Sequence, residues 1–161
     1  MKTQPIATLL GAIVLVFASP ALRADDSHNH THADGHEHAK KEAGPNGGRI
    51  IETADSKFEF FVTPEKKVKI TFLDEAGKSI EPAEQDIKAI GGERKSPTRL
   101  TFTKEGGAFI SDKELPEGKE VPMILMVKAT PEAKTEVEKF NVNLAKCPTC
   151  EFAEYACICA H

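Results

Sequence analysis

The sequence predicts an all-β fold, namely an antiparallel immunoglobulin-like β-sandwich with a disordered His-rich tail before it and a short Cys-rich segment after it. Three observations predict this. Apolar and polar residues alternate with period two in several short runs, turn-forming residues separate the runs, and residues 49–144 carry no apolar stripe with the 3.6-residue period of a helix. Seven or eight short strands in one such range are typical of an immunoglobulin-like sandwich.

The first element is expected to be an export signal. Lys2 precedes an apolar run at residues 6–18 (IATLLGAIVLVFA), and small residues follow it, as in a cleaved signal peptide. We place the cleavage after Ala24, so that residues 1–24 are removed and the mature chain is periplasmic or extracellular, without membrane attachment. The alternative is a retained membrane anchor, because the uncharged stretch 3–22 approaches the roughly 20 residues that span a bilayer.

Residues 25–48 are expected to form a disordered tail that ends in a turn. The stretch 25–43 (DDSHNHTHADGHEHAKKEA) contains no Val, Ile, Leu or Phe, so it cannot bury enough apolar surface to offset the entropy of ordering the chain. The GPNGG sequence at 44–48 is dense in residues that break regular structure. It separates the tail from the sandwich domain at 49–144.

Strands of the sandwich are expected where the period-two pattern is clearest. These runs are 58–62 (FEFFV), 67–74 (KVKITFLD), 98–103 (TRLTFT), 121–127 (VPMILMV) and 140–144 (FNVNL). The turn sequences DEAGK, IGGERKSP, KEGG and LPEGK lie between runs. The VPMILMV run is apolar on both faces, so it is expected to be a central strand, with Met123 and Met126 in the core rather than at a copper site.

Composition excludes one class of partner. The chain has 21 Lys and Arg against 25 Asp and Glu, a formal net charge of −4, and signal cleavage would remove Lys2 and Arg23 but no acid. Nucleic-acid binding needs a basic surface, so we expect no nucleic-acid partner. Mild acidity instead suits solubility and a weak preference for cations.

Five of the six histidines lie within residues 28–38 (HNHTHADGHEH). Neutral imidazole is a strong ligand for zinc, copper and nickel, and a histidine with a pKa near 6.5 is mostly neutral at pH 7. His-rich tracts are typical of metal binding. We expect several exchanging modes rather than one rigid site, because Asn29, Asp34 and Gly35 disfavour the helix that would stack His28, His32 and His36. The candidate ligands are His28, His30, His32, His36 and His38. The alternative is a solvated or pH-responsive tail without a metal ion.

Residues 145–161 contain all four cysteines and the remaining histidine, in the pattern Cys147-x2-Cys150-x6-Cys157-x-Cys159-x-His161. Thiolates and an imidazole can form a tetrahedral zinc site, and soft sulfur also suits Cu(I). The candidate ligands are therefore Cys147, Cys150, Cys157, Cys159 and His161.

Two alternatives for the cysteines stay open. Export generally leads to an oxidising compartment, where four cysteines can form two disulfides in any of three connectivities. The CPTC sequence also has the CxxC form of thiol oxidoreductases, in which Cys147 and Cys150 would be the redox pair. That chemistry needs the pair at a helix N-terminus behind a βαβ unit, whereas here it follows a β pattern.

The predicted sandwich shows no catalytic constellation. Residues 49–144 contain no histidine, so a Ser-His-Asp or Cys-His arrangement cannot form within them. We therefore expect a protein that is not an enzyme.

The junction HEHAKKEAGPNGGRII resembles the His-rich leader and GGR turn of periplasmic adaptor subunits of heavy-metal efflux pumps, and the chain as a whole resembles His-rich exported heavy-metal-binding proteins. The resemblance covers residues 28–75 and leaves out the coiled-coil hairpin and lipoyl-like domain of those adaptors. It implies a place in divalent-metal or copper tolerance, with a metal-efflux or uptake component as the candidate partner.

The sequence thus predicts an exported, non-enzymatic protein that binds transition-metal ions, zinc or copper first and nickel next, for capture, storage or delivery. The alternatives are a structural or interaction sandwich with two disulfides, and a thiol–disulfide redox protein.

Overall fold

The computed structural model describes residues 41–159, all of which belong to one of the two units into which the chain divides, Glu37–His161. The strands are β1 (Arg49–Glu52), β2 (Lys57–Val62), β3 (Lys67–Leu73), β4 (Asp86–Gly91), β5 (Thr98–Glu105), β6 (Ala108–Glu114), β7 (Val121–Lys128) and β8 (Glu136–Val142), followed by the 3₁₀ helix η1 (Glu154–Ala156). The predicted signal peptide, the alternative membrane anchor and the His-rich stretch lie outside the described residues. Among residues 41–159, no helix is long and apolar enough to cross a bilayer.

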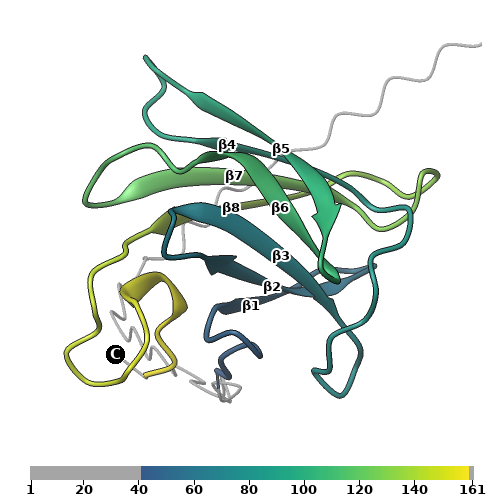
Figure 1. Ribbon diagram of the computed structural model, residues 1–161, viewed down its shortest axis with the longest axis horizontal. Helices are drawn as coiled ribbons and strands as arrows, with labels where there is room; N and C mark the ends of the chain where they lie inside the picture. Colours follow the sequence, from purple (N-terminus) through teal and green to yellow (C-terminus); the bar gives the residue numbers. More distant parts are fainter. Residues whose placement is uncertain (1–40, 160–161) are drawn as a thin grey trace, which may run out of the picture. The chain divides into compact units, whose positions relative to one another are not determined.

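The eight strands form one antiparallel sheet in the order β1-β2-β3-β6-β5-β4-β7-β8, curled into a half-barrel (Figure 1). Strand β5 joins the two halves because it changes partner along its length. Its first four residues pair with β4, and its residues from Phe102 onwards pair with β6. The prediction of an all-β antiparallel fold is confirmed. The division into two separate sheets, as in an immunoglobulin-like sandwich, is not confirmed, since one shared strand carries the hydrogen bonding around the bend.

The concave side of the sheet encloses the hydrophobic core. Strands β2 and β8 are far apart in the sheet order, yet the rings of Phe60 and Phe140 meet edge to face with centroids 5.0 Å apart. Phe58 packs on Phe72, and Phe72 packs on Phe109, at 5.6 and 6.0 Å. The chain has no tryptophan, so phenylalanines supply most of the aromatic part of the core. Aromatic pairs of this kind add stability beyond their buried area.

Strand β7 differs in part from its prediction. Val121, Met123, Leu125 and Val127 point into the core, but the alternate residues face outwards, and Met126 is only half-buried. Strand β7 lies between β4 and the edge strand β8, and its outward residues are exposed or half-buried. Met123 is a core residue as expected, whereas Met126 pairs across the strands with Val137 on the outer face.

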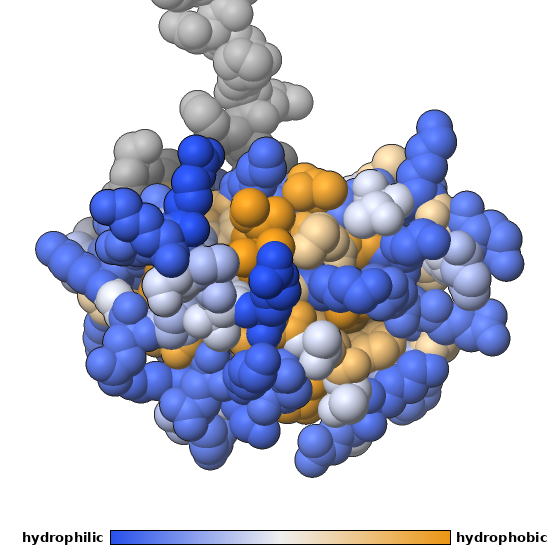
Figure 2. Space-filling view, turned by 90° about the horizontal axis from the view of Figure 1, so that it is seen from above, coloured by the Kyte–Doolittle hydropathy of each residue, from blue (hydrophilic) through white to orange (hydrophobic). Residues whose placement is uncertain are grey.

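The other differences concern short or polar strands. Strand β8 begins at Glu136 and ends at Val142, earlier than the expected 140–144. Its outward positions are polar apart from Val137, which is 49% exposed, as suits an edge strand. None of the alternating runs in the sequence predicted strands β1, β4 and β6. In the view from above, apolar residues reach the surface between hydrophilic ones (Figure 2), which is ordinary for a sheet with one uncovered face.

The GPNGG sequence forms a turn built around a buried carboxylate. Glu59 of β2 is fully buried, and its carboxylate accepts hydrogen bonds from the Asn46 backbone N–H (2.9 Å), the Asn46 side-chain amide (2.6 Å) and the Gly48 N–H (2.7 Å). A Cβ at Gly44 would overlap the Glu59 side chain, and a Cβ at Gly48 would also overlap the Phe60 carbonyl. The glycines are required because the chain passes directly over this carboxylate. The predicted turn is confirmed.

Candidate metal centre

The cysteines lie in a narrow loop that follows β8. Its two sides are joined by backbone hydrogen bonds from the Cys147 N–H to Phe152 O (2.9 Å) and from the Glu154 N–H to Ala145 O (2.9 Å). The CPTC sequence forms the tip between these two sides, and η1 brings the chain back before Cys157 and Cys159. The local backbone therefore folds two sequence-separated cysteine pairs onto one another.

Tyr155 fixes the loop to the core. It is 8% exposed, its ring meets Phe60 edge to face with centroids 5.9 Å apart, and its hydroxyl oxygen accepts a hydrogen bond from the Val62 N–H at 3.0 Å. Burial raises the pKa of the Tyr155 hydroxyl, so it stays neutral at physiological pH. The cysteine loop is thus packed on the sheet by an aromatic side chain with a satisfied polar end.

All four sulfurs converge. One ligand atom from each of Cys147, Cys150, Cys157 and Cys159 lies within 4.8 Å of every other. The Sγ atom of Cys157 is 3.3 Å from that of Cys147 and 3.8 Å from that of Cys150. Tetrahedral ligation with zinc–sulfur bonds of about 2.3 Å places sulfurs about 3.8 Å apart. The four thiols therefore fit a metal ion of this size after small side-chain movements.

Thr149 contacts two of the four sulfurs. Its hydroxyl lies 3.3 Å from Cys147 Sγ and donates a hydrogen bond to Cys159 Sγ at 3.1 Å. The Thr149 hydroxyl and backbone N–H are the main causes that lower the pKa of Cys147 to about 5. At neutral pH, Cys147 is therefore a thiolate, which is the form that metals bind.

Cys157 is the opposite case. The Cys159 N–H donates to its sulfur at 3.3 Å and acts to lower its pKa. Burial and the three neighbouring thiols outweigh this contact and raise the pKa of Cys157 to about 12. Negative charge on adjacent sulfurs is costly without a cation, so a bound metal ion would have to displace this proton. Cys147 is thus already deprotonated at neutral pH, whereas Cys157 would lose its proton only when a metal ion binds.

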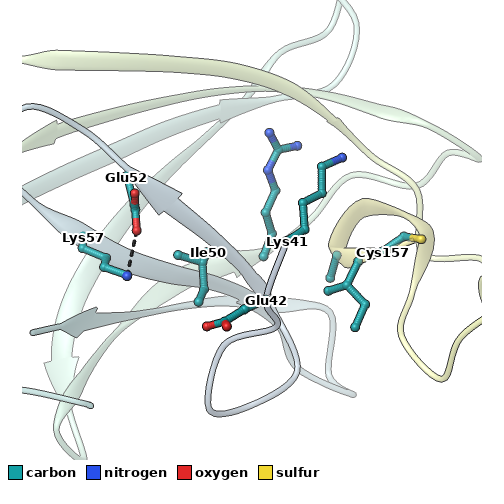
Figure 3. A pocket seen from close by; sticks show the side chains of 9 residues that line it. Lys41, Glu42, Ile50, Glu52, Lys57 and Cys157 are labelled. Atoms are coloured by element: carbon teal, nitrogen blue, oxygen red, sulfur yellow. Dashed lines mark ion pairs between the residues drawn. The ribbon is translucent and has the colours of Figure 1, made fainter. Parts of the chain in front are cut away.

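A cavity of about 340 Å³ adjoins the cluster. Its lining comes from both ends of the described chain and from the first two strands: Lys41, Glu42, Arg49, Ile50, Glu52, Lys57, Ala156, Cys157 and Ile158. Lys57 pairs with Glu52 at 2.7 Å on one side (Figure 3). Lys41 stands between β1 and the Cys157 segment, and the Cys157 sulfur points away from the Glu52–Lys57 pair (Figure 3). The N-terminal approach to the sheet thus lies beside the cysteine loop.

The structure brings together four of the ten predicted ligands: Cys147, Cys150, Cys157 and Cys159. The other six, His28, His30, His32, His36, His38 and His161, lie outside the described residues. Sequence reasoning missed Thr149, although a hydroxyl residue inside a CxxC sequence is a visible signal for a hydrogen bond to sulfur. The cavity had no such signal, because its lining residues are distant in sequence.

A comparison of the chain with protein-family models, with curated proteins and with solved structures finds no significant match. The geometry of the cysteine cluster is therefore what the function has to be argued from.

Proposed function

We propose that this chain is an exported, non-enzymatic transition-metal-binding protein whose four-cysteine cluster holds a zinc ion, with Cu(I) as the second candidate metal. One observation carries the proposal: four sulfurs from two sequence-separated pairs lie within 4.8 Å of one another. A tetrahedral set of four thiolates is the donor set of closed zinc sites, and Cu(I) shares the preference for sulfur. In such a site the metal is held rather than used in a reaction.

The decisive experiment is native mass spectrometry of protein purified without chelators. We expect one metal ion per chain, and four thiols that become titratable once the metal has been removed. A Cys150→Ser variant tests the site because it removes one ligand and leaves the buried Cys147 in place. Metal-free protein in which all four cysteines are oxidised, and which takes up no zinc after reduction, would contradict the proposal.

The His-rich stretch 28–38 is proposed to capture metal at lower affinity, with zinc, copper and nickel as its ions. What supports this is composition, since five imidazoles in eleven residues offer many exchanging donors. Calorimetry on the exported chain and on a version without residues 25–43 tests it. Equal zinc and copper stoichiometry in the two proteins would contradict the capture role. Export to the periplasm or beyond, and an efflux or uptake component as partner, belong to the same proposal.

A second function is favoured by one distance. The Sγ atoms of Cys147 and Cys157 are 3.3 Å apart, close enough for an oxidant to join them, which would leave Cys150 to pair with Cys159. The chain would then be a structural or interaction module with two disulfides. Peptide mapping of non-reduced protein decides between this function and metal ligation. The thiol oxidoreductase alternative gains no support, because within residues 41–159 no helix begins at the CPTC sequence.

A further inference from the structure

A second cavity lies on the face of β3 that points away from the core. Core residues of β3 alternate with Lys69 and Thr71, so these two side chains project to the opposite face of the sheet. There they line a cavity of about 240 Å³ together with residues 45–46, 79–81 and 106–107. Four segments that are distant in the sequence thus enclose one space, which we call the β3 cavity.

Hydrogen bonds fix two walls of the β3 cavity. The Ile80 backbone N–H donates to Phe72 O at 2.9 Å, so residues 79–81 run beside β3. On another side, the Lys69 ammonium group donates to Asn46 Oδ1 at 3.1 Å. Asn46 is itself held by the buried carboxylate at the 44–48 turn. The lining side chains are therefore positioned by the fold.

The hydroxyl of Thr71 lies in this cavity without a partner. Thr71 is 3% exposed, and within residues 41–159 its Oγ1 atom makes no hydrogen bond. Glu59, which is opposite Thr71 on β2, is already bonded to Asn46 and Gly48. A buried hydroxyl without a partner costs free energy and is rare in native proteins. A ligand that accepts a hydrogen bond from Thr71 would recover that cost.

The lining carries one positive and one negative side chain, Lys69 and Glu81. The Glu81 carboxylate lies against the 106–107 turn, because a Cβ added at Gly107 would be 3.4 Å from its Oε1 atom. Among residues 41–159, neither Lys69 nor Glu81 belongs to an ion pair. An anionic ligand would meet the Glu81 carboxylate, and a cationic ligand would meet the Lys69 ammonium group, and such like-charge contacts are costly. A ligand with both charges fits this lining.

We propose that the β3 cavity binds a small zwitterion of the aliphatic α-amino acid class. Its carboxylate pairs with Lys69 and accepts a hydrogen bond from the Thr71 hydroxyl, and its ammonium group pairs with Glu81. Pro45 and Ile80 line the same cavity and offer apolar contact to the ligand's side chain. Cavities for drug-sized ligands measure about 300–1,000 Å³, so a cavity of about 240 Å³ suits a ligand of smaller size.

The test is a titration of the isotope-labelled exported chain, followed by the chemical shifts of its backbone amides. The probes are L-alanine and L-valine, with acetate and ethylamine as ligands that carry only one of the two charges. We expect saturable shifts at Thr71, Glu81 and Gly107 with both amino acids, and no saturable shifts in the cysteine loop at 147–159. Acetate and ethylamine should bind about tenfold more weakly or less, because each lacks one of the two charged contacts.

Three variants assign the contacts. Thr71→Val should weaken alanine binding about threefold to tenfold, whereas Thr71→Ser should retain it, because only serine keeps the hydroxyl. The valine variant should unfold at an unchanged or higher temperature, since the hydroxyl it removes has no partner in the protein. Lys69→Met should weaken binding by about tenfold or more. Lys95→Met is the matched control, since Lys95 is exposed in a loop away from this cavity, and it should bind alanine normally.

Three outcomes would overturn the proposal. If neither amino acid shifts these amides, the Thr71 hydroxyl is bonded to water alone. If acetate or ethylamine binds as tightly as alanine, the cavity does not recognise two charges. If Thr71→Val binds alanine like the unmodified protein, the buried hydroxyl has no part in a ligand site.

Discussion

The phenol oxygen of Tyr155 accepts a hydrogen bond from the backbone N–H of Val62 at 3.0 Å, and this contact ties the cysteine loop to the end of β2. The same side chain packs on Phe60 in the core. Tyr155 is the loop's aromatic residue within the core cluster, Ala156 lies in the core beside it, and Phe152 and Ala153 pack against the core from the same loop.

Tyr155→Phe should therefore lower the free energy of unfolding by about 1 kcal/mol, since it leaves the Val62 N–H without its partner while keeping the ring. Urea denaturation of the metal-free protein measures this. Tyr155→Ala should cost more, about 3 kcal/mol or above, because the ring contact is lost as well. Equal stability of the phenylalanine variant and the unmodified protein would show that the hydrogen bond does not hold the loop.

Replacing Thr149 should weaken metal binding without unfolding the protein. Its hydroxyl contacts the sulfurs of both Cys147 and Cys159, and the loss of such a contact next to a metal ligand typically costs 10–100-fold in affinity. Thr149→Val removes the hydroxyl at nearly constant volume, whereas Thr149→Ser keeps it. Competition with a coloured zinc chelator should show weaker binding for valine and near-normal binding for serine. If both variants bind alike, the hydroxyl has no part in the site.

The all-β antiparallel class and the clustering of the four cysteines could be predicted from the sequence because both are local signals. Period-two alternation indicates strands such as 67–73. Four cysteines within thirteen residues lie close together in almost any fold of the segment. The continuous sheet could not be foreseen, because it depends on β5 pairing with β4 through one half and with β6 through the other. No feature of residues 98–105 predicts that change of partner.

Other features depended on contacts between distant segments. The glycines at 44–48 predicted a turn. They did not predict that the turn encloses Glu59, because in the sequence Glu59 is an ordinary acidic residue within a strand. The cavity shared by Lys41 and Cys157 joins residues more than a hundred positions apart. In the sequence, residues 41–48 and the cysteine loop lie near opposite ends of the chain, and the folded sheet places Gly47 next to the Phe152 ring of that loop.

Gly48→Ala should destabilise the protein strongly, because the new Cβ would overlap the Phe60 carbonyl and the Glu59 side chain. We expect a loss of about 2 kcal/mol or more in unfolding free energy, as for other overpacked sites. Gly118→Ala is the matched control, since its nearest neighbour atom would be a Val121 methyl at an ordinary 3.4 Å. Similar thermal unfolding midpoints for the two variants would contradict the close approach at Gly48.

Glu59→Gln tests the same turn from the opposite side. All three hydrogen-bond partners of the Glu59 carboxylate are N–H donors, so an amide nitrogen in place of one oxygen would face a donor. Charged acceptors also make the stronger bonds. We expect a loss of about 2–3 kcal/mol in unfolding free energy, measured by urea denaturation. Retained stability would mean that the turn does not depend on the carboxylate charge.

The metal-free cluster should show one thiolate that forms far below the ordinary range. The pKa of Cys147 is lowered to about 5, chiefly by Thr149, so its thiolate is present above that pH and is lost as the pH falls through it. The ultraviolet absorbance of thiolate, followed in reduced protein from acidic to neutral pH, should rise in one step near pH 5 that Cys147→Ser abolishes. Thr149→Val should move the step to higher pH, because it removes the hydroxyl that favours the charged form. A first step at the ordinary cysteine range near 8.5 would contradict both the assignment and the role of Thr149.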